Sequence, residues 1–212
     1  APMDAGEWTR RVRKLRKTWA AITEIDFFPG EAQRQTEALL RELEARPSPG
    51  EPEGRPGTVR LHDPAAYRRR LWATRRNLWV DRIASAWLIR RFIDREARFL
   101  WLASPTDCPA EAVGFDFDGA EFTHVETANG IWVTFETLLA AFGLERDTAL
   151  GRIAAIVHQL DVGGLPVAEA AGLERLLQGI RERTPDDDAL LADASRLLDD
   201  LHLAFQKETE TP

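Results

Sequence analysis

The chain has 212 residues, 44% of them apolar, which suits a globular protein and allows one substantial domain with or without an appendage. Its formal net charge of −7 argues against non-specific nucleic-acid binding by the whole chain, and its longest apolar runs are too short to span a bilayer. The single cysteine, Cys108, excludes an intrachain disulfide and a multi-cysteine zinc site, and together with an N-terminus that lacks an apolar signal region it predicts a cytoplasmic protein.

The first 46 residues predict an N-terminal helical arm. Apolar residues at helical spacing favour a first helix that ends at the Phe-Pro-Gly break of residues 28–30, and a second helix from Glu31 to about Ala45. The first helix carries a strongly basic run, for which local DNA contact and a solvated helix face are both open interpretations. The basic residues are Arg10, Arg11, Arg13, Lys14, Arg16 and Lys17.

Residues 47–60 predict a linker, because proline and glycine dominate this stretch and it contains no apolar anchor. The remaining residues, 61–212, have the length of a natural single domain. The predicted organisation is therefore an arm, a linker and one main domain.

The main domain is predicted to be mostly helical around one small sheet. Asp81 is a candidate N-cap for a helix that ends near Ala97. Strands are expected at 98–103, 113–117 and 121–125. The last two strands would form a hairpin through the turn at 118–119. Further helices are expected at about 134–143, 148–160, from 166 onward and 186–206, with Thr134 and Asp147 as caps of the first two. Few strands among many helices indicate an α+β fold.

Two histidines and two carboxylates form a candidate metal site. His124 lies in the predicted strand 121–125, Glu136 lies in the first turn of a predicted helix, and His158 precedes Asp161 by one helical turn. Nitrogen and oxygen ligands without thiolate favour zinc, manganese or iron(II). Spacing alone leaves open a hydrogen-bonded His–Asp pair in the core.

Asp116 and Asp118 lie two residues apart near the end of a predicted strand. Aspartate favours turns, so we interpret both as a hairpin end, with a metal role as the alternative.

Residues 71–102 combine four tryptophans with a series of arginines, which favours apolar side chains packed inward beside a cationic wall. Arg75, Arg76 and Arg82 are the candidate anion-binding residues, because the planar guanidinium offers paired donors to an oxyanion such as sulfate, phosphate or chromate. Pairing with acidic residues, or stacking over tryptophan faces, is the alternative.

Four segments, in order, resemble the ChrB-type chromate resistance proteins: WATRRNLWVDRIASAWLIRRFIDREARFLWL, FDFDGAEFTH, VTFETLLAAFGL and AIVHQLD. The resemblance covers about residues 71–161. It implies a role in chromate-responsive transcriptional regulation and a shared site built from the FTH, TFE and VHQLD segments. It also implies that this chain corresponds to the C-terminal chromate resistance domain and lacks the winged-helix-like N-terminal domain of longer members.

Three functions follow as hypotheses. The favoured one is a chromate resistance accessory or sensor protein that binds a metal ion, an oxyanion such as chromate, or both. The second is a metal-dependent enzyme with a His/carboxylate site that acts on an oxyanion or small molecule, although no flavin or nicotinamide fingerprint is present. The third is a chromate-responsive DNA-binding regulator. A homodimer is compatible with all three.

Overall fold

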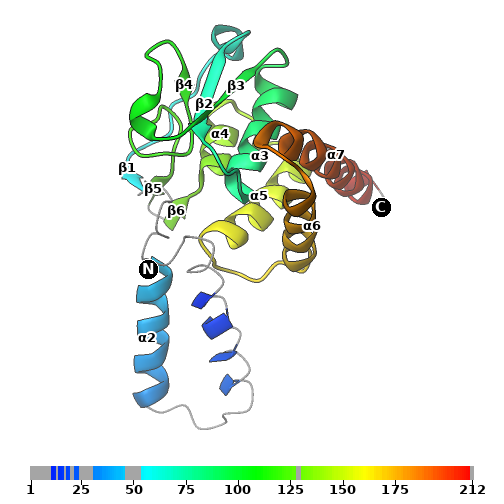
Figure 1. Ribbon diagram of the computed structural model, residues 1–212. Helices are drawn as coiled ribbons and strands as arrows, with labels where there is room; N and C mark the ends of the chain where they lie inside the picture. The colour runs from blue at the N-terminus through cyan, green and yellow to red at the C-terminus, as the bar shows by residue number, and fades with distance from the viewer. Residues whose placement is uncertain are drawn as a thin grey trace. The chain divides into compact units, whose positions relative to one another are not determined.

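The computed structural model describes residues 11, 12, 14–16, 18, 19, 22, 23, 31–45, 54–127 and 130–210 (Figure 1). The chain divides into two compact units. The first comprises residues 1–51 with 162–164, and the second comprises residues 52–161 with 165–212. The arm, linker and domain boundaries expected above remain predictions.

In the first unit, helix α2 spans Glu31–Ala45, as the sequence predicts. Arg16 donates to both carboxylate oxygens of Glu37, at 2.9 and 2.8 Å, and the Trp19 indole donates to the same carboxylate. Arg11 and Lys14 of the basic run are exposed. Arg10, Arg13 and Lys17 lie outside the described residues, so the DNA contact remains a prediction.

The main sheet of the second unit has three parallel strands in the order β3-β2-β4 (Figure 1). They are β2 (Leu71–Arg75), β3 (Arg98–Leu102) and β4 (Val113–Gly114). Helix α3 (Val80–Leu88) connects β2 to β3, because parallel neighbours require a crossover. Strand β2 is central and its middle three residues are buried.

A second sheet has the order β1-β5-β6. Its strands are β1 (Arg55–Pro56), β5 (Val125–Thr127) and β6 (Gly130–Trp132). β1 runs parallel to β5, and β6 runs antiparallel to β5. Arg55 and Pro56, which fall within the predicted linker, therefore belong to a sheet. The predicted α+β class is confirmed, and the described residues form two small sheets in place of the expected one.

The expected hairpin at 118–119 is wrong. Gly119 does form a turn with φ of +89°, but Phe115 and Phe122 on either side of it pair in parallel. The predicted strand 121–125 also begins late, since β5 starts only at Val125. Turn-forming residues reverse the chain locally and do not by themselves fix the direction of pairing.

The remaining helices are α4 (Thr134–Ala141), α5 (Thr148–Asp161), α6 (Ala170–Arg183) and α7 (Asp187–Glu210). Asp147 accepts hydrogen bonds from the Ala149 and Leu150 N–H groups, as expected of the residue before α5. Val133, and not the predicted Thr134, is the N-cap of α4. Short 3₁₀ turns form at Pro64–Tyr67 and Pro105–Asp107.

The predicted helix from Asp81 to Ala97 is shorter and less regular. Regular α-helix ends at Leu88, and a π-helical turn, Ile89–Ile93, completes it. Asp94 then leaves the helix and is buried, where its carboxylate accepts hydrogen bonds from the backbone N–H groups of Arg69 and Arg70 and from the Trp72 indole. These long-range bonds stop the helix before its predicted end.

Aromatic residues dominate the core of the second unit. Of the four tryptophans of residues 71–102, Trp72 and Trp87 are fully buried, as the sequence suggests, whereas Trp79 and Trp101 are only partly buried. Phe115, Phe122 and Phe135 are fully buried as well. Trp87 stacks on Phe135 of α4, with ring centroids 6.5 Å apart. Among the described residues, no helix combines the length and apolar character needed to cross a membrane.

Candidate functional site

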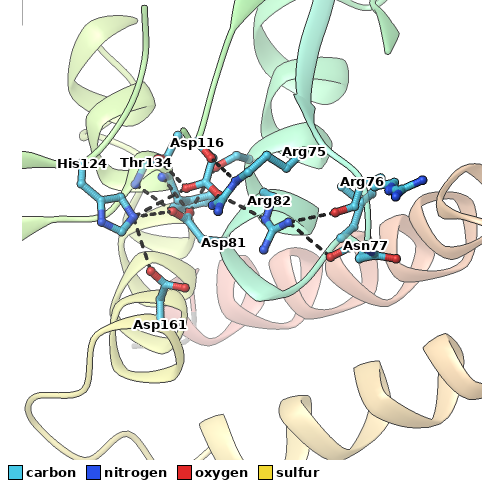
Figure 2. A network of polar contacts seen from close by, with 12 residues as sticks. Arg75, Arg76, Asn77, Asp81, Arg82, Asp116, His124, Thr134 and Asp161 are labelled. Carbon is cyan, nitrogen blue, oxygen red and sulfur yellow. Dashed lines mark hydrogen bonds and ion pairs between the residues drawn. The ribbon is translucent and has the colours of Figure 1, made fainter. Parts of the chain in front are cut away.

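Three carboxylates surround one imidazole nitrogen in the second unit (Figure 2). His124 Nε2 lies 3.3 Å from Asp81 Oδ2, 3.6 Å from Asp116 Oδ1 and 3.4 Å from Asp161 Oδ2. All four residues are buried. Because buried charges are costly unless they are paired, so dense a cluster requires a strong reason for its retention.

Each member comes from a different element. Asp81 lies in the first turn of α3, Asp116 follows β4, His124 precedes β5 and Asp161 is the last residue of α5. Asp116 has φ of +56°, a left-handed conformation that aspartate tolerates better than most residues. The crossover β2-α3-β3 and the parallel sheet bring these distant segments to one point.

Asp81 is not the N-cap of its own helix, which begins after Trp79. Instead its carboxylate accepts hydrogen bonds from the backbone N–H groups of Thr134 and Phe135, at 2.8 and 2.9 Å. These are N–H groups of the first turn of α4, which lack partners within that helix. Asp81 therefore supplies the cap of α4 from a neighbouring helix.

Two of the three predicted anion-binding arginines reach Asp116. Arg82 Nε lies 3.2 Å and Arg75 Nη2 lies 3.5 Å from Asp116 Oδ2. Arg76 is exposed and its side chain points away from Asp116, while its backbone carbonyl accepts a hydrogen bond from Arg82 (Figure 2). Arg75 and Arg82 therefore pair with an acidic residue, which is the alternative to anion binding that the sequence leaves open. Binding of an anion remains a prediction.

The charges within the cluster change the pKa values of its members. Burial alone would lower the pKa of His124, but the hydrogen bond to Asp81 and the charges of Asp161 and Asp116 outweigh it and raise this pKa to about 10. Burial would likewise raise the pKa of Asp116, yet Arg82, His124 and Arg75 lower it. For Asp81, burial dominates and raises the pKa. The imidazole is thus protonated at neutral pH, beside an ionised Asp116.

The four predicted metal ligands form two pairs. His124 and Asp161 lie in the cluster, whereas His158 Nδ1 and Glu136 Oε2 form a separate contact of 2.9 Å. The same Glu136 oxygen accepts the Val133 N–H at the start of α4, which matches the helix-start interpretation. The predicted ligand set remains untested, but the structure favours different partners for His124.

Asp81, Asp116 and His124 each offer one ligand atom, and these atoms lie within 4.8 Å of one another. Carboxylate oxygens with one imidazole nitrogen suit manganese, iron(II) or zinc, the metals that the sequence suggests. The sequence predicts only a capping role for Asp81, and a turn role for Asp116 with metal binding as the alternative. The sequence feature that could have identified both as site residues is an aspartate between apolar neighbours, in WVDRIA and GFDFDG.

The second unit also contains the match to a known family. The family model described as ChrB, C-terminal domain, matches residues 72–205. The chain belongs to the ChrB family. It is 50% identical over 206 residues to Protein ChrB of Cupriavidus metallidurans, an alignment that covers 95% of this chain and 62% of that relative. No solved structure matches the chain. The family match confirms the resemblance and includes all residues of the cluster.

Proposed function

We propose that this chain is a sensor or accessory protein of chromate resistance, and that Asp81, Asp116 and His124 bind a divalent metal ion with Asp161 beside them. The family supports the biological role. The observation that carries the metal proposal is the cluster itself, in which three buried carboxylates from three elements meet one imidazole nitrogen.

The burial of the site and its carboxylate oxygens favour a metal ion over an oxyanion as the ligand. His124 is 2% exposed and Asp116 is fully buried, and the carboxylates of Asp81 and Asp161 face the same point. A tetrahedral oxyanion would meet the oxygens of three carboxylates at close range, whereas a small cation that displaces the His124 proton would be held between them. When bound, the ion would supply positive charge to the carboxylates. His124 would then serve as a ligand through its neutral form.

The arginines provide a connection from this cluster to the rest of the second unit. Arg82 joins Asp116 to the backbone carbonyls of Arg76 and Asn77, at 3.2 and 3.3 Å (Figure 2). The next link is Asp187 at the start of α7, which accepts the Asn77 and Leu78 N–H groups. A change in charge at Asp116 would therefore alter the hydrogen bonds that Arg82 makes with the loop before α3, and through this loop the contacts of Asp187 at the start of α7. A sensor requires such a connection between its site and the rest of the molecule.

Calorimetric titration of the purified chain with Mn²⁺, Zn²⁺, chromate and sulfate tests the proposal. We expect a divalent metal to bind with a stoichiometry near one, and Asp116→Asn and His124→Gln to weaken this binding at least about tenfold. Asp118→Asn is the matched control, because Asp118 is exposed and only two residues from Asp116. Absence of metal binding in the wild-type chain would overturn the metal site. Equal affinities in Asp116→Asn and the control would refute the ligand assignment.

A further inference from the structure

A second polar site lies at the segment that leads into β2. It is a surface pocket of about 360 Å³, which is within the range of small-molecule sites. Its lining residues are Arg60, Leu61, His62, Asp63, Ala66, Tyr67, Arg70 and Glu121. None of them is a member of the Asp81, Asp116 and His124 cluster.

The walls of the pocket are held in place. The His62 N–H donates to the Ala141 carbonyl at 2.7 Å, which ties the segment to α4. Tyr67 is buried, and its ring packs edge-on against Phe142, with centroids 5.0 Å apart, and against Phe122. The Tyr67 hydroxyl and the His62 ring are therefore held by a fixed aromatic base and need little ordering to receive a ligand.

Hydrogen bonds within the pocket determine which of its groups accept and which donate. The Tyr67 hydroxyl donates to Glu121 Oε1 at 2.5 Å and lies 2.7 Å from His62 Nδ1. Because the phenol has one proton and gives it to the carboxylate, His62 Nδ1 must be the donor in the second contact. In the neutral ring this leaves Nε2 as an acceptor. Burial and the Glu121 carboxylate both raise the pKa of Tyr67, so the phenol keeps its proton.

Two guanidinium groups complete the pocket. Arg60 and Arg70 line it, and their positive charges both act on the Tyr67 hydroxyl, which places them near the hydrogen-bonded chain. Each guanidinium offers paired donors suited to a tetrahedral oxyanion. Against these cations stand the carboxylates of Glu121 and Asp63. The pocket thus combines donors for anionic oxygens with acceptors for a proton.

We propose that this pocket binds a tetrahedral oxyanion that carries a proton at neutral pH, as hydrogen phosphate does. The arginines would receive its charged oxygens, while Glu121 or His62 Nε2 would accept its hydroxyl proton. Sulfate has no proton at neutral pH, so it would place an oxygen against these acceptors and leave them without a donor. Such a mismatch is strongly unfavourable in a site built from hydrogen-bonding groups.

Calorimetry with inorganic phosphate, chromate and sulfate at neutral pH tests this inference. We expect phosphate to bind at least about tenfold more tightly than sulfate. Chromate is the intermediate case, because only a minor part of it carries a proton at this pH. Arg60→Ala and Arg70→Ala should each weaken binding about tenfold, whereas Arg69→Ala should not, because Arg69 does not line the pocket and pairs with Glu96 at 2.9 Å.

Glu121→Gln provides the sharper test, since this exposed side chain can change without disturbing the core. It should reduce the preference for phosphate over sulfate severalfold. The oxyanion titrations use metal-free protein, so their outcome does not depend on whether the proposed metal site is correct. The proposal is overturned if sulfate binds as tightly as phosphate, if phosphate does not bind, or if the Arg60→Ala and Arg70→Ala variants bind phosphate as the wild type does.

Discussion

Asp81 accepts hydrogen bonds from the Thr134 and Phe135 N–H groups although it belongs to a different helix. It also accepts one from the Ser85 hydroxyl at 3.2 Å and lies 3.3 Å from His124 Nε2. A single carboxylate therefore serves both the start of α4 and the candidate metal site. Loss of this side chain would leave buried donors without an acceptor.

We predict that Asp81→Ala lowers the free energy of unfolding by about 2–4 kcal/mol, because two buried N–H groups lose their acceptor. Urea denaturation followed by circular dichroism measures this loss. Asp118→Ala is the comparison, since Asp118 is exposed and a change there should cost less than about 0.5 kcal/mol. Equal stability of the two variants would disprove the capping role.

His124 makes stability depend on pH in a defined direction. Its pKa is about 10 in the folded chain and 6.5 as an ordinary histidine, so the folded state binds the proton more tightly. The resulting stabilisation is complete below the ordinary value and is lost as the pH rises from there through about 10. We predict that the metal-free wild-type chain loses stability between pH 7 and 9.5 more steeply than His124→Gln. Urea midpoints across that range measure both slopes, and parallel slopes would contradict the shifted pKa.

At the level of residues, sequence reasoning identifies His124 and Asp161 but pairs them differently. Both helical neighbours, His158 and Asp161, lie near the end of α5, yet one contacts Glu136 and the other contacts His124. Helical spacing tells which side chains share a face, and packing against other elements decides their partners. For the same reason, the role of Asp81 toward α4 could not be found from its local sequence.

Among the elements, β2 is the clearest omission from the sequence analysis. It is the central strand of a parallel sheet, and Trp72, Ala73 and Thr74 are all fully buried. A strand covered on both faces shows no alternation of polar and apolar residues, so its pattern is not distinctive. By contrast, the sequence predicts the bounds of α2 and β3 to within one residue of those observed. Helical periodicity marks α2, and a run of bulky residues marks β3.

Strand β4 positions Asp116 through a close approach at Gly114. A Cβ atom on residue 114 would lie 2.7 Å from Phe117 Cζ and 3.3 Å from the Ala120 methyl group. The ring of Phe117 is buried and has little room to move. A larger residue at 114 would therefore push against the Phe117 ring and Ala120, which lie in the turn that follows Asp116.

We predict that Gly114→Ala destabilises the chain by about 1–3 kcal/mol through this overpacking and also weakens metal binding, because Asp116 moves with the turn. Thermal unfolding and calorimetric titration measure the two effects. Gly151→Ala is the control, since a Cβ on that helical glycine meets nothing within 4 Å. A Gly114→Ala variant as stable as the control would contradict this packing argument.

For the whole molecule, the family match and the cluster coincide in the second unit. Residues 72–205 match the C-terminal domain of ChrB, and this range contains all four members of the cluster. The chain spans 62% of the length of the curated relative, so the role of that whole protein comes to this chain only as a proposal. Arg60, His62, Tyr67 and Arg70 of the proposed oxyanion pocket lie before the matched range.

Elemental analysis of the chain after loading with Mn²⁺, Fe²⁺ or Zn²⁺ and removal of free metal tests the central proposal most directly. We predict about one ion per chain in the wild type and in Asp118→Asn, and little in Asp116→Asn or His124→Gln. Circular dichroism shows whether each variant remains folded. A wild-type chain that retains no metal, or a folded Asp116→Asn variant that retains as much metal as the wild type, would contradict the proposed site.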